Sequence, residues 1–390
     1  MARVCMVAYT HYPTDSRVRR EAEALVERGD TVDFICLGSE NDKQTELYNG
    51  VKLIKIYIKR YRGSNILMYM ASYLQFFLVA TLKLIKLQTK NLYQIIQIHT
   101  MPDFMVFVAI IPKLLGAKVL LDVHDLMPEL YQSKFGFADN HPLIRFITWI
   151  ERISVRFADR ALAVHKTHLE ALCSHGSPFE KFTIVLNLPD MKIFSKEGHK
   201  SGEKSDFELI YHGTVSERHG LEIALRAIAT LHGKIQGLKL KIIGDGDGIS
   251  RLIELVDELD LHNYIDINKG MIPLDELVPK IQAADVGIVP ILYDDFTKYM
   301  LPVKLLEYVA LKKPVICSRT QTIEAYFDNS MVQYFSPGSI NELADSIYTL
   351  YIDSDRRTEL SINADRFNQE YNWASQKQTY YLLIDDLIKE

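Results

Sequence analysis

Residues 298–318 read KYMLPVKLLEYVALKKPVICS, and this stretch predicts a helix followed directly by a strand. Pro302 suits the first turn of a helix, because its ring fixes φ and its missing N–H is not needed there. Apolar residues then recur on one helical face, and a short apolar run follows at 314–317. We therefore expect a helix over 302–311 that packs on a sheet with its N-terminus pointing outward.

The start of this helix has the properties of an anion site. The first N–H groups of a helix have no partner within the helix, and they carry the positive end of its dipole, which suits a phosphate. Lys304 adds a cation in the first turn, where the dipole alone would disfavour it. Glu307 follows about one turn later, within reach of a ribose hydroxyl. The alternative is an ordinary amphipathic helix with a solvated lysine and glutamate.

Composition bounds the class of protein. The chain has 390 residues, of which 48% are hydrophobic and 24% charged, which is enough for two globular domains. A net charge of −5 argues against nucleic acid as a partner. The four cysteines are scattered without a CxxC pair, which indicates reduced thiols in a cytoplasmic protein and not a disulfide or zinc framework. The sequence opens directly on a strand pattern, so we expect no signal peptide.

The first half has the pattern of a doubly wound α/β domain. A short apolar strand at 4–9 is followed by a helix at 16–28 and a second strand at 31–37. In such sheets, ligands bind at the carboxyl ends of the strands. His99 and His124 each end a later predicted strand and should lie at that edge. The sequence has no GxGxxG motif, which disfavours a dinucleotide dehydrogenase.

The second half repeats this pattern after a break. A charged segment with glycine and serine at 195–206 is the expected linker, and a strand at 208–213 restarts the alternation. A further strand is followed by a glycine-rich turn at residues 244–248. Asp245 and Asp247 in this turn could be read as metal ligands, but the alternating glycines favour a plain turn.

Residues 47–102 differ from the rest of the chain because they contain no Asp or Glu. Within them, 64–82 is a stretch of 19 uncharged residues, close to the length of about 20 that a transmembrane helix needs. This stretch also carries Ser, Asn, Gln and Tyr, and it lies between two predicted strands. We therefore favour a partly buried helix with a basic, aromatic, membrane-facing side, and a transmembrane span and an internal helix remain alternatives. The eight basic residues of the segment are Lys52, Lys55, Lys59, Arg60, Arg62, Lys83, Lys86 and Lys90.

The pattern P-x-K-x-x-E-Y-x-A over 302–310, closed by Pro-Val at 314–315, resembles the nucleotide-sugar site of the family 4 retaining glycosyltransferases. The resemblance implies a GT-B fold, with two Rossmann-like doubly wound domains and a C-terminal helix that crosses back to the first. The expected domains are an acceptor-binding domain at 1–195, with the helix at 371–390 packing on it, and a nucleotide-sugar-binding domain at 206–370. In that family, the glutamate that matches Glu307 holds the donor ribose.

The resemblance also implies how the diphosphate is held. The family clamps it with an arginine and a lysine, but these positions are Thr214 and His219 here. Arg218 is the expected substitute, because a guanidinium suits forked phosphate contacts. Tyr299 stands where the family has a second glutamate, eight residues before Glu307. The donor-binding candidates are Gly213, Thr214, His219, Gly244, Tyr299, Met300, Leu301 and Pro302.

Two segments of the first half resemble the acceptor side of the family. LDVHDLMPE at 121–129 is similar to the segment whose histidine lies against the donor sugar and the acceptor, which makes His124 a candidate catalytic residue beside Asp125. Both could instead be structural hydrogen-bonding residues. DSRVRREA at 15–22 resembles one branch of the family and adds Asp15 and Arg17 as acceptor-side candidates.

Together these patterns predict a retaining glycosyltransferase that moves a hexose-type sugar from a nucleoside-diphosphate sugar, with UDP favoured over GDP, to a lipid-linked saccharide in surface polysaccharide or glycolipid synthesis. The catalytic candidates are His124, Arg218, Lys304 and Glu307, with no metal or other cofactor. We expect a cytoplasmic protein that binds the inner face of an anionic membrane through 47–102. A GT-B sugar-nucleotide epimerase and a non-catalytic sugar-nucleotide-binding subunit are the alternatives.

Overall fold

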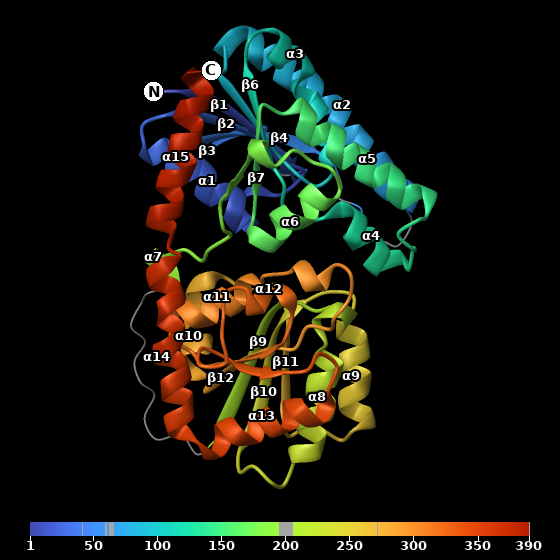
Figure 1. Ribbon diagram of the computed structural model, residues 1–390, viewed down its shortest axis with the longest axis vertical. Helices are drawn as coiled ribbons and strands as arrows, with labels where there is room; N and C mark the ends of the chain where they lie inside the picture. Colours follow the sequence, from blue (N-terminus) through green and yellow to red (C-terminus); the bar gives the residue numbers. More distant parts are fainter. Residues whose placement is uncertain (41, 59–60, 62–65, 195–205, 271, 390) are drawn as a thin grey trace. The chain divides into compact units, whose positions relative to one another are not determined.

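The computed structural model describes residues 1–389 apart from 41, 59–60, 62–65, 195–205 and 271. The chain divides into two compact units, one of Met1–Asn187 with Ala374–Glu390 and one of Leu188–Trp373 (Figure 1). The division thus falls a few residues before the linker expected at 195–206, most of which lies outside the described residues.

The first unit is built on an eight-stranded sheet in the order β3-β4-β2-β1-β5-β6-β7-β8. Strand β3 is antiparallel to β4, and the other pairs are parallel. Its central strands are buried along nearly their whole length, as in a sheet covered on both faces. The strands are β1 (Arg3–Val7), β2 (Thr31–Gly38), β3 (Thr45–Tyr48), β4 (Val51–Tyr57), β5 (Ile95–His99), β6 (Lys118–Asp122), β7 (Arg160–Ala163) and β8 (Phe182–Ile184).

Helices cover this sheet, and the first of them follows the expected pattern. The Asp15 carboxylate caps its N-terminus by accepting from the Val18 N–H, and Gly29 follows its C-terminus with a φ of 96°. The helices of this unit are α1 (Ser16–Glu27), α2 (Ile66–Asn91), α3 (Ile110–Leu114), α4 (Met127–Phe135), α5 (Pro142–Phe157), α6 (Lys166–Ser174) and α15 (Trp373–Lys389).

Helix α2 has two faces of different character. Its 24 residues Met68–Asn91 have a mean hydropathy of up to 1.4, so it is long and apolar enough to cross a membrane, although 28% of the most apolar window is buried within the protein. The side chains buried against the unit are Ser72, Tyr73, Phe76, Ala80, Leu84 and Gln88. Met68 is also exposed, and a row of exposed apolar side chains spaced about a turn apart is formed by Met70, Leu74, Leu78 and Leu82.

The second unit is a six-stranded parallel sheet in the order β11-β10-β9-β12-β13-β14. Its strands are β9 (Phe207–Thr214), β10 (Leu238–Asp245), β11 (Ile265–Lys269), β12 (Val286–Val289), β13 (Val315–Ser318) and β14 (Gln333–Phe335). Its helices are α7 (Met191–Phe194), α8 (Leu221–Leu231), α9 (Ile249–Glu258), α10 (Leu274–Ala283), α11 (Val303–Ala310), α12 (Gln321–Glu324), α13 (Ile340–Ile352) and α14 (Ser354–Glu370).

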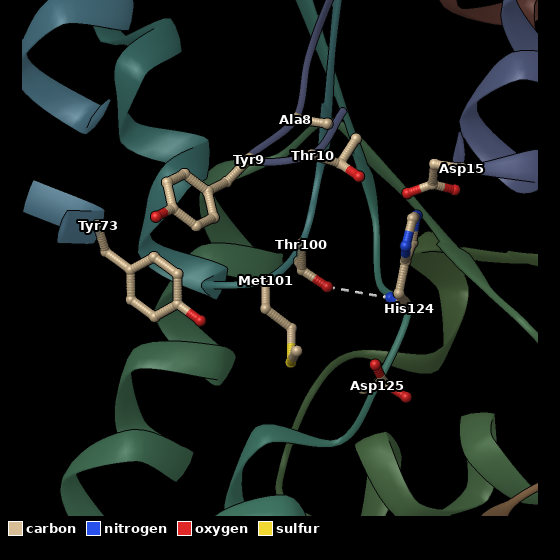
Figure 2. A pocket seen from close by; sticks show the side chains of 9 residues that line it. All are labelled: Ala8, Tyr9, Thr10, Asp15, Tyr73, Thr100, Met101, His124 and Asp125. Atoms are coloured by element: carbon tan, nitrogen blue, oxygen red, sulfur yellow. Dashed lines mark hydrogen bonds between the residues drawn. The ribbon is translucent and has the colours of Figure 1, made fainter. Parts of the chain in front are cut away.

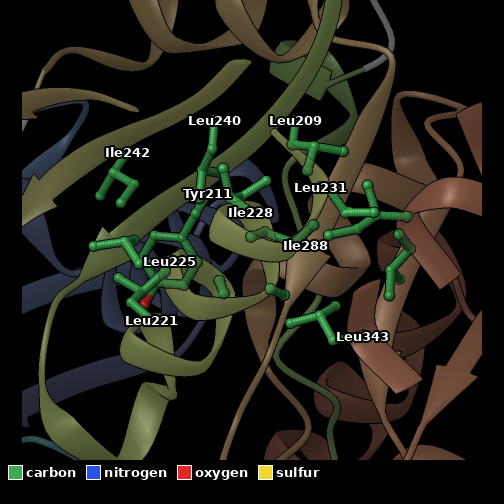
Figure 3. Close-up of a cluster of buried hydrophobic side chains, with 14 of the residues drawn as sticks. Leu209, Tyr211, Leu221, Leu225, Ile228, Leu231, Leu240, Ile242, Ile288 and Leu343 are labelled. Atoms are coloured by element: carbon green, nitrogen blue, oxygen red, sulfur yellow. The ribbon is translucent and has the colours of Figure 1, made fainter. Parts of the chain in front are cut away.

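The core of the second unit lies between β9, β10 and the helices α8 and α13 (Figure 3). Leu209 and Tyr211 project from β9 into this cluster, where they meet Leu225 of α8 among other apolar side chains. Because successive strand residues point to opposite faces, His212 leaves this cluster and faces the other side of the sheet.

Helix α11 packs on the sheet through Tyr308, and both the helix and the strand after it lie close to their predicted positions. The Tyr308 ring lies so close to Gly287 of β12 that a Cβ at that glycine would be 2.5 to 2.8 Å from three ring atoms. Its hydroxyl lies 3.1 Å from the Ile210 carbonyl oxygen of β9. Pro302 is the N-cap residue of α11, so the first turn of the helix begins at the carboxyl edge of the sheet.

This packing predicts the effect of a single methyl group at Gly287. Gly287→Ala should destabilise the protein by about 1–3 kcal/mol, because the added carbon overlaps the Tyr308 ring. The melting temperature should fall by several degrees, as expected for a domain of this size. Gly338→Ala is the comparison, since nothing lies within 4 Å of its added carbon and only the backbone cost of its φ of 81° applies. Equal melting temperatures for the two variants would show that Tyr308 does not fix α11.

Candidate active site

Glycines allow close backbone packing at the carboxyl ends of the strands of the second unit. A Cβ on Gly244 would lie 1.9 Å from the Gly213 carbonyl oxygen, and one on Gly220 would lie 1.9 Å from the Pro290 carbonyl oxygen. Gly220 also has a φ of 65°, which favours glycine. The ends of β9 and β10, where the expected positions Gly213 and Gly244 pair with each other, and the loops after β9 and β12 therefore pack backbone against backbone.

Lys304 reaches from the first turn of α11 to the end of β9. Its Nζ lies 2.6 Å from the Tyr211 hydroxyl oxygen and 4.0 Å from the centroid of the Tyr211 ring. The Tyr211 hydroxyl in turn donates to the Thr214 carbonyl. Burial lowers the pKa of Lys304 to about 7, and the charge of Glu307 partly opposes this shift. The amine is thus held beside the Gly213–Thr214 backbone, poised between its neutral and charged forms.

His219 and Arg218 differ in charge near pH 7. Burial, together with the positive charges of Lys304 and Arg218, lowers the pKa of the His219 imidazole to about 3. Its Nδ1 lies 2.9 Å from the Ser216 hydroxyl. His219 is therefore neutral near pH 7 in this structure, whereas the Arg218 guanidinium lies 5.2 Å above the Phe296 ring, close enough to His219 to affect its pKa.

Glu307 has a partner that the sequence did not single out. Its Oε2 lies 2.6 Å from Nε2 of His212, which is 95 residues earlier in the chain on β9. Nδ1 of His212 lies 3.0 Å from the Tyr308 hydroxyl. The only signal for His212 was a polar residue in a predicted strand at 208–213 that is mostly apolar after Glu208, which also fits an ordinary structural position.

The remaining donor-side candidates lie around the start of α11. Tyr299 ends the short 3-10 helix Thr297–Tyr299, Met300 and Leu301 are half-buried, and Pro302 is buried. No side chain of the described residues caps the helix at Pro302, so the first N–H groups of α11 are not taken by a cap. Asp245 accepts from the Gly246 N–H at 2.9 Å, as in the predicted glycine turn.

The first unit has a pocket of about 170 Å³ at the carboxyl edge of its sheet (Figure 2). Figure 2 shows Tyr9 and Tyr73 on one side of it and Asp15, His124 and Asp125 on the other. The pocket thus brings together three of the acceptor-side candidates, and it adds an aromatic wall that the sequence analysis did not identify. Its lining residues are Ala8, Tyr9, Thr10, Asp15, Tyr73, Thr100, Met101, His124 and Asp125.

His124 is fixed at the edge of this pocket by two contacts. Its backbone N–H donates to the Thr100 hydroxyl at 3.0 Å, and its Nε2 lies 2.7 Å from Oδ2 of Asp122. His99 Nδ1 lies 2.9 Å from the same oxygen. Burial alone would lower the pKa of His124, but the Asp122 carboxylate outweighs it and the pKa is raised.

Arg17 lies beneath the pocket and does not line it. Its Nε and Nη2 lie 2.9 and 2.6 Å from the two carboxylate oxygens of Asp122, and its Nη1 donates to the Val185 carbonyl at 2.9 Å. Although burial opposes ionisation, the Arg17 charge keeps the pKa of Asp122 well below its usual value. The contacts that Arg17 makes are therefore with the protein, and it positions Asp122, which in turn holds His124.

In the described part of the chain, one group of side chains has donor atoms close enough to share a metal ion. These are His99, Asp122 and His124, whose donor atoms all lie within 4.8 Å of one another. However, the Arg17 guanidinium already neutralises the Asp122 carboxylate in a bidentate contact. A metal cation at Asp122 would be repelled by the positive charge of this guanidinium. This geometry fits a hydrogen-bonded network better than a metal site.

Two sequence families match successive parts of the chain. The model of Glycosyltransferase Family 4 matches residues 15–191, and the model of Glycosyl transferases group 1 matches residues 206–353. Among curated proteins, WcaL of Salmonella typhimurium, assigned to colanic acid biosynthesis as a glycosyltransferase, is 28% identical over 162 residues. Its Escherichia coli counterpart is 26% identical over the same length. Each match covers 41% of this chain and 39% of the relative, so it spans about two fifths of either protein.

Solved structures match the chain over its whole length. Sucrose-phosphate synthase from Thermosynechococcus elongatus has a TM-score of 0.80 at 18% identity, with all of both chains covered. HepE of Anabaena, in complex with UDP-glucose, has a TM-score of 0.72 at 14% identity, with 99% of this chain and 100% of that chain covered. At these identities the likeness concerns the fold. The chain therefore has the GT-B fold, and its two units match glycosyltransferase families in their order along the sequence.

Proposed function

We propose that the protein is a retaining glycosyltransferase that transfers a hexose-type sugar from UDP-sugar to a lipid-linked saccharide. The observation that carries this proposal is the meeting of the α11 N-terminus, Lys304, Arg218 and Glu307 at one edge of the second sheet. The UDP-glucose bound to HepE supports uracil as the base of the donor, and the assignment of WcaL to colanic acid biosynthesis supports an acceptor in polysaccharide synthesis.

The chemistry proposed for this site is stabilisation of the leaving group. As the bond between the anomeric carbon and the diphosphate breaks, negative charge grows on the diphosphate oxygens. Lys304, Arg218 and the first N–H groups of α11 are preorganised to neutralise that charge. A phosphate beside Lys304 would raise the pKa of its amine from about 7 and make it fully cationic. No metal ion is required, because these groups supply the positive charge.

The pocket of the first unit has the composition of a sugar site. The rings of Tyr9 and Tyr73 offer apolar surface to the C–H face of a sugar ring. The side chains of Asp15, His124 and Asp125 can form hydrogen bonds with its hydroxyls. We propose this pocket as the acceptor site. We assign no side chain as general base, since an oxygen of the departing diphosphate can accept the proton of the attacking hydroxyl.

The outer face of α2 supports a peripheral position at the cytoplasmic face of a membrane. Helix α3 contacts α2 (Figure 1) and also carries exposed apolar side chains. Lys86 and Lys90 near the end of α2 are exposed and suit an anionic surface. The opposite face of α2 is packed on the sheet, which favours adsorption over a span. The exposed apolar residues of α3, of the position directly after it and of α5 are Ile110, Ile111, Leu114, Leu115, Phe146 and Trp149.

Replacing Glu307 tests the ribose contact. Glu307→Ala should weaken UDP binding roughly tenfold or more, because a hydrogen bond to a charged group is lost. Isothermal titration calorimetry gives the affinity, and circular dichroism checks that the variant is folded. Glu359→Ala, an exposed glutamate on α14, is the matched control and should bind UDP like the natural protein. Equal affinity of the Glu307→Ala variant would rule out this contact.

The pKa of Lys304 predicts how UDP binding depends on pH. Only the protonated amine attracts the diphosphate, so the affinity should fall as pH rises from 7 to 9, above a pKa of about 7. Lys304→Met should bind more weakly and lose this pH dependence. Titrations of both proteins with UDP across that pH range, with and without EDTA, measure whether the affinity falls as pH rises and whether it requires a metal ion. Affinity that rises with pH, or that collapses in EDTA, would contradict the assignment.

Vesicle flotation tests the membrane surface. The protein should float with anionic vesicles at low salt, and less at high salt or with neutral lipid, because screening weakens the attraction. Lys86→Glu with Lys90→Glu should reduce flotation strongly. Lys234→Glu with Lys269→Glu makes the same change of charge on the second unit and should have little effect. Extraction that needs detergent at any salt would indicate a transmembrane α2 instead.

A further inference from the structure

Behind Glu307, strand β9 carries a histidine with both ring nitrogens engaged. Nε2 of His212 lies 2.6 Å from Oε2 of Glu307, and Nδ1 lies 3.0 Å from the Tyr308 hydroxyl. An ionised carboxylate only accepts hydrogen bonds, so Nε2 must carry the hydrogen. We propose that His212 is a positioning residue for donor recognition, whose Nε2–H fixes the Glu307 carboxylate so that its other oxygen faces the ribose. This inference rests on the proposed function and on Glu307 as the ribose ligand.

The His212 ring is itself held rigidly, which is what a positioning residue requires. The side chain is only 7% exposed, and its ring meets the Tyr308 ring edge to face with centroids 5.0 Å apart. Its backbone lies inside the sheet, where His212 pairs with Ile243 of β10. Tyr308 is in turn fixed against Gly287. The orientation of Glu307 therefore follows from the sheet through two packed aromatic side chains.

The hydroxyl of Tyr308 allows His212 to keep this role in either protonation state. That hydroxyl lies within hydrogen-bonding distance of both the Ile210 carbonyl, at 3.1 Å, and His212 Nδ1. When it donates to Nδ1, the imidazole is neutral. When it donates to Ile210, Nδ1 is free to carry a second hydrogen and donate to the hydroxyl oxygen. In both arrangements Nε2 donates to Glu307.

Fixing Glu307 in advance affects both affinity and selectivity. A glutamate side chain has several rotatable bonds, and ordering it on binding costs free energy that a preorganised side chain does not lose. A site built to bond a hydroxyl also rejects an analogue that lacks it. If His212 is removed, Glu307 is free to turn toward solvent, where its side chain is already 15% exposed. The site should then bind UDP more weakly and distinguish ribose less well.

Calorimetry with UDP and 2′-deoxy-UDP tests this directly. His212→Leu should weaken UDP binding roughly tenfold and should bind the two nucleotides with nearly equal affinity. His212→Gln, whose amide N–H reaches about as far as Nε2, should retain most of the affinity and of the preference for ribose. His232→Leu, an exposed histidine in the same unit, is the matched control and should behave like the natural protein. If His212→Leu does not fold, His212→Asn replaces it with the same expected result, because its shorter amide does not reach Glu307.

A double variant separates positioning from general stability. In a Glu307→Ala background, His212→Leu should cause less than a twofold further loss of UDP affinity, because its effect passes through Glu307. Independent losses that multiply, or a ribose preference that survives His212→Leu, would overturn the inference while leaving Glu307 as the ribose ligand. If the natural protein binds neither UDP nor GDP, the proposed function itself fails, and this outcome is distinct from the first.

Discussion

The packing of Tyr308 on Gly287 is the contact on which the candidate donor site depends. It seats α11 on β12, and the helix then places three functional groups at the edge of the second sheet, which are its own N-terminus, Lys304 and Glu307. The same tyrosine also bonds to His212 and the Ile210 carbonyl of β9. Tyr308 therefore fixes the distance of α11 from the sheet, the rotation of α11 about its axis and the orientation of the Glu307 carboxylate.

The two units hold their histidines in related but different ways. In the first unit, the Asp122 carboxylate accepts from His124 and His99, and Arg17 neutralises it from below. In the second unit, a histidine donates to a carboxylate that remains partly open to solvent. The first arrangement fixes the imidazole at the edge of a pocket, whereas the second fixes the carboxylate. In both units a histidine is paired with a carboxylate. The first unit presents the imidazole to the pocket, and the second presents the carboxylate.

Local patterns were enough to predict α11, β13 and the parallel strands, because helical periodicity and proline chemistry are encoded over a few residues. They also placed Lys304 and Glu307 on one helix. Partners distant in sequence could not be found in this way. His212 meets Glu307 across 95 residues, and Arg17 meets Asp122 across 105, so Arg17 was expected to face an acceptor although it is buried. His219 matched a cationic position of the family, but its burial, visible only in the fold, leaves it neutral.

The proposed function depends on a nucleotide held by α11, and a crystal structure of the protein with UDP tests this most directly. We predict that the diphosphate lies at the α11 N-terminus beside Lys304 and Arg218. A ribose hydroxyl should lie within about 3.2 Å of a Glu307 oxygen, with the other oxygen still bonded to His212. UDP bound elsewhere on the second unit, or a Glu307 side chain turned away from both the ribose and His212, would contradict it.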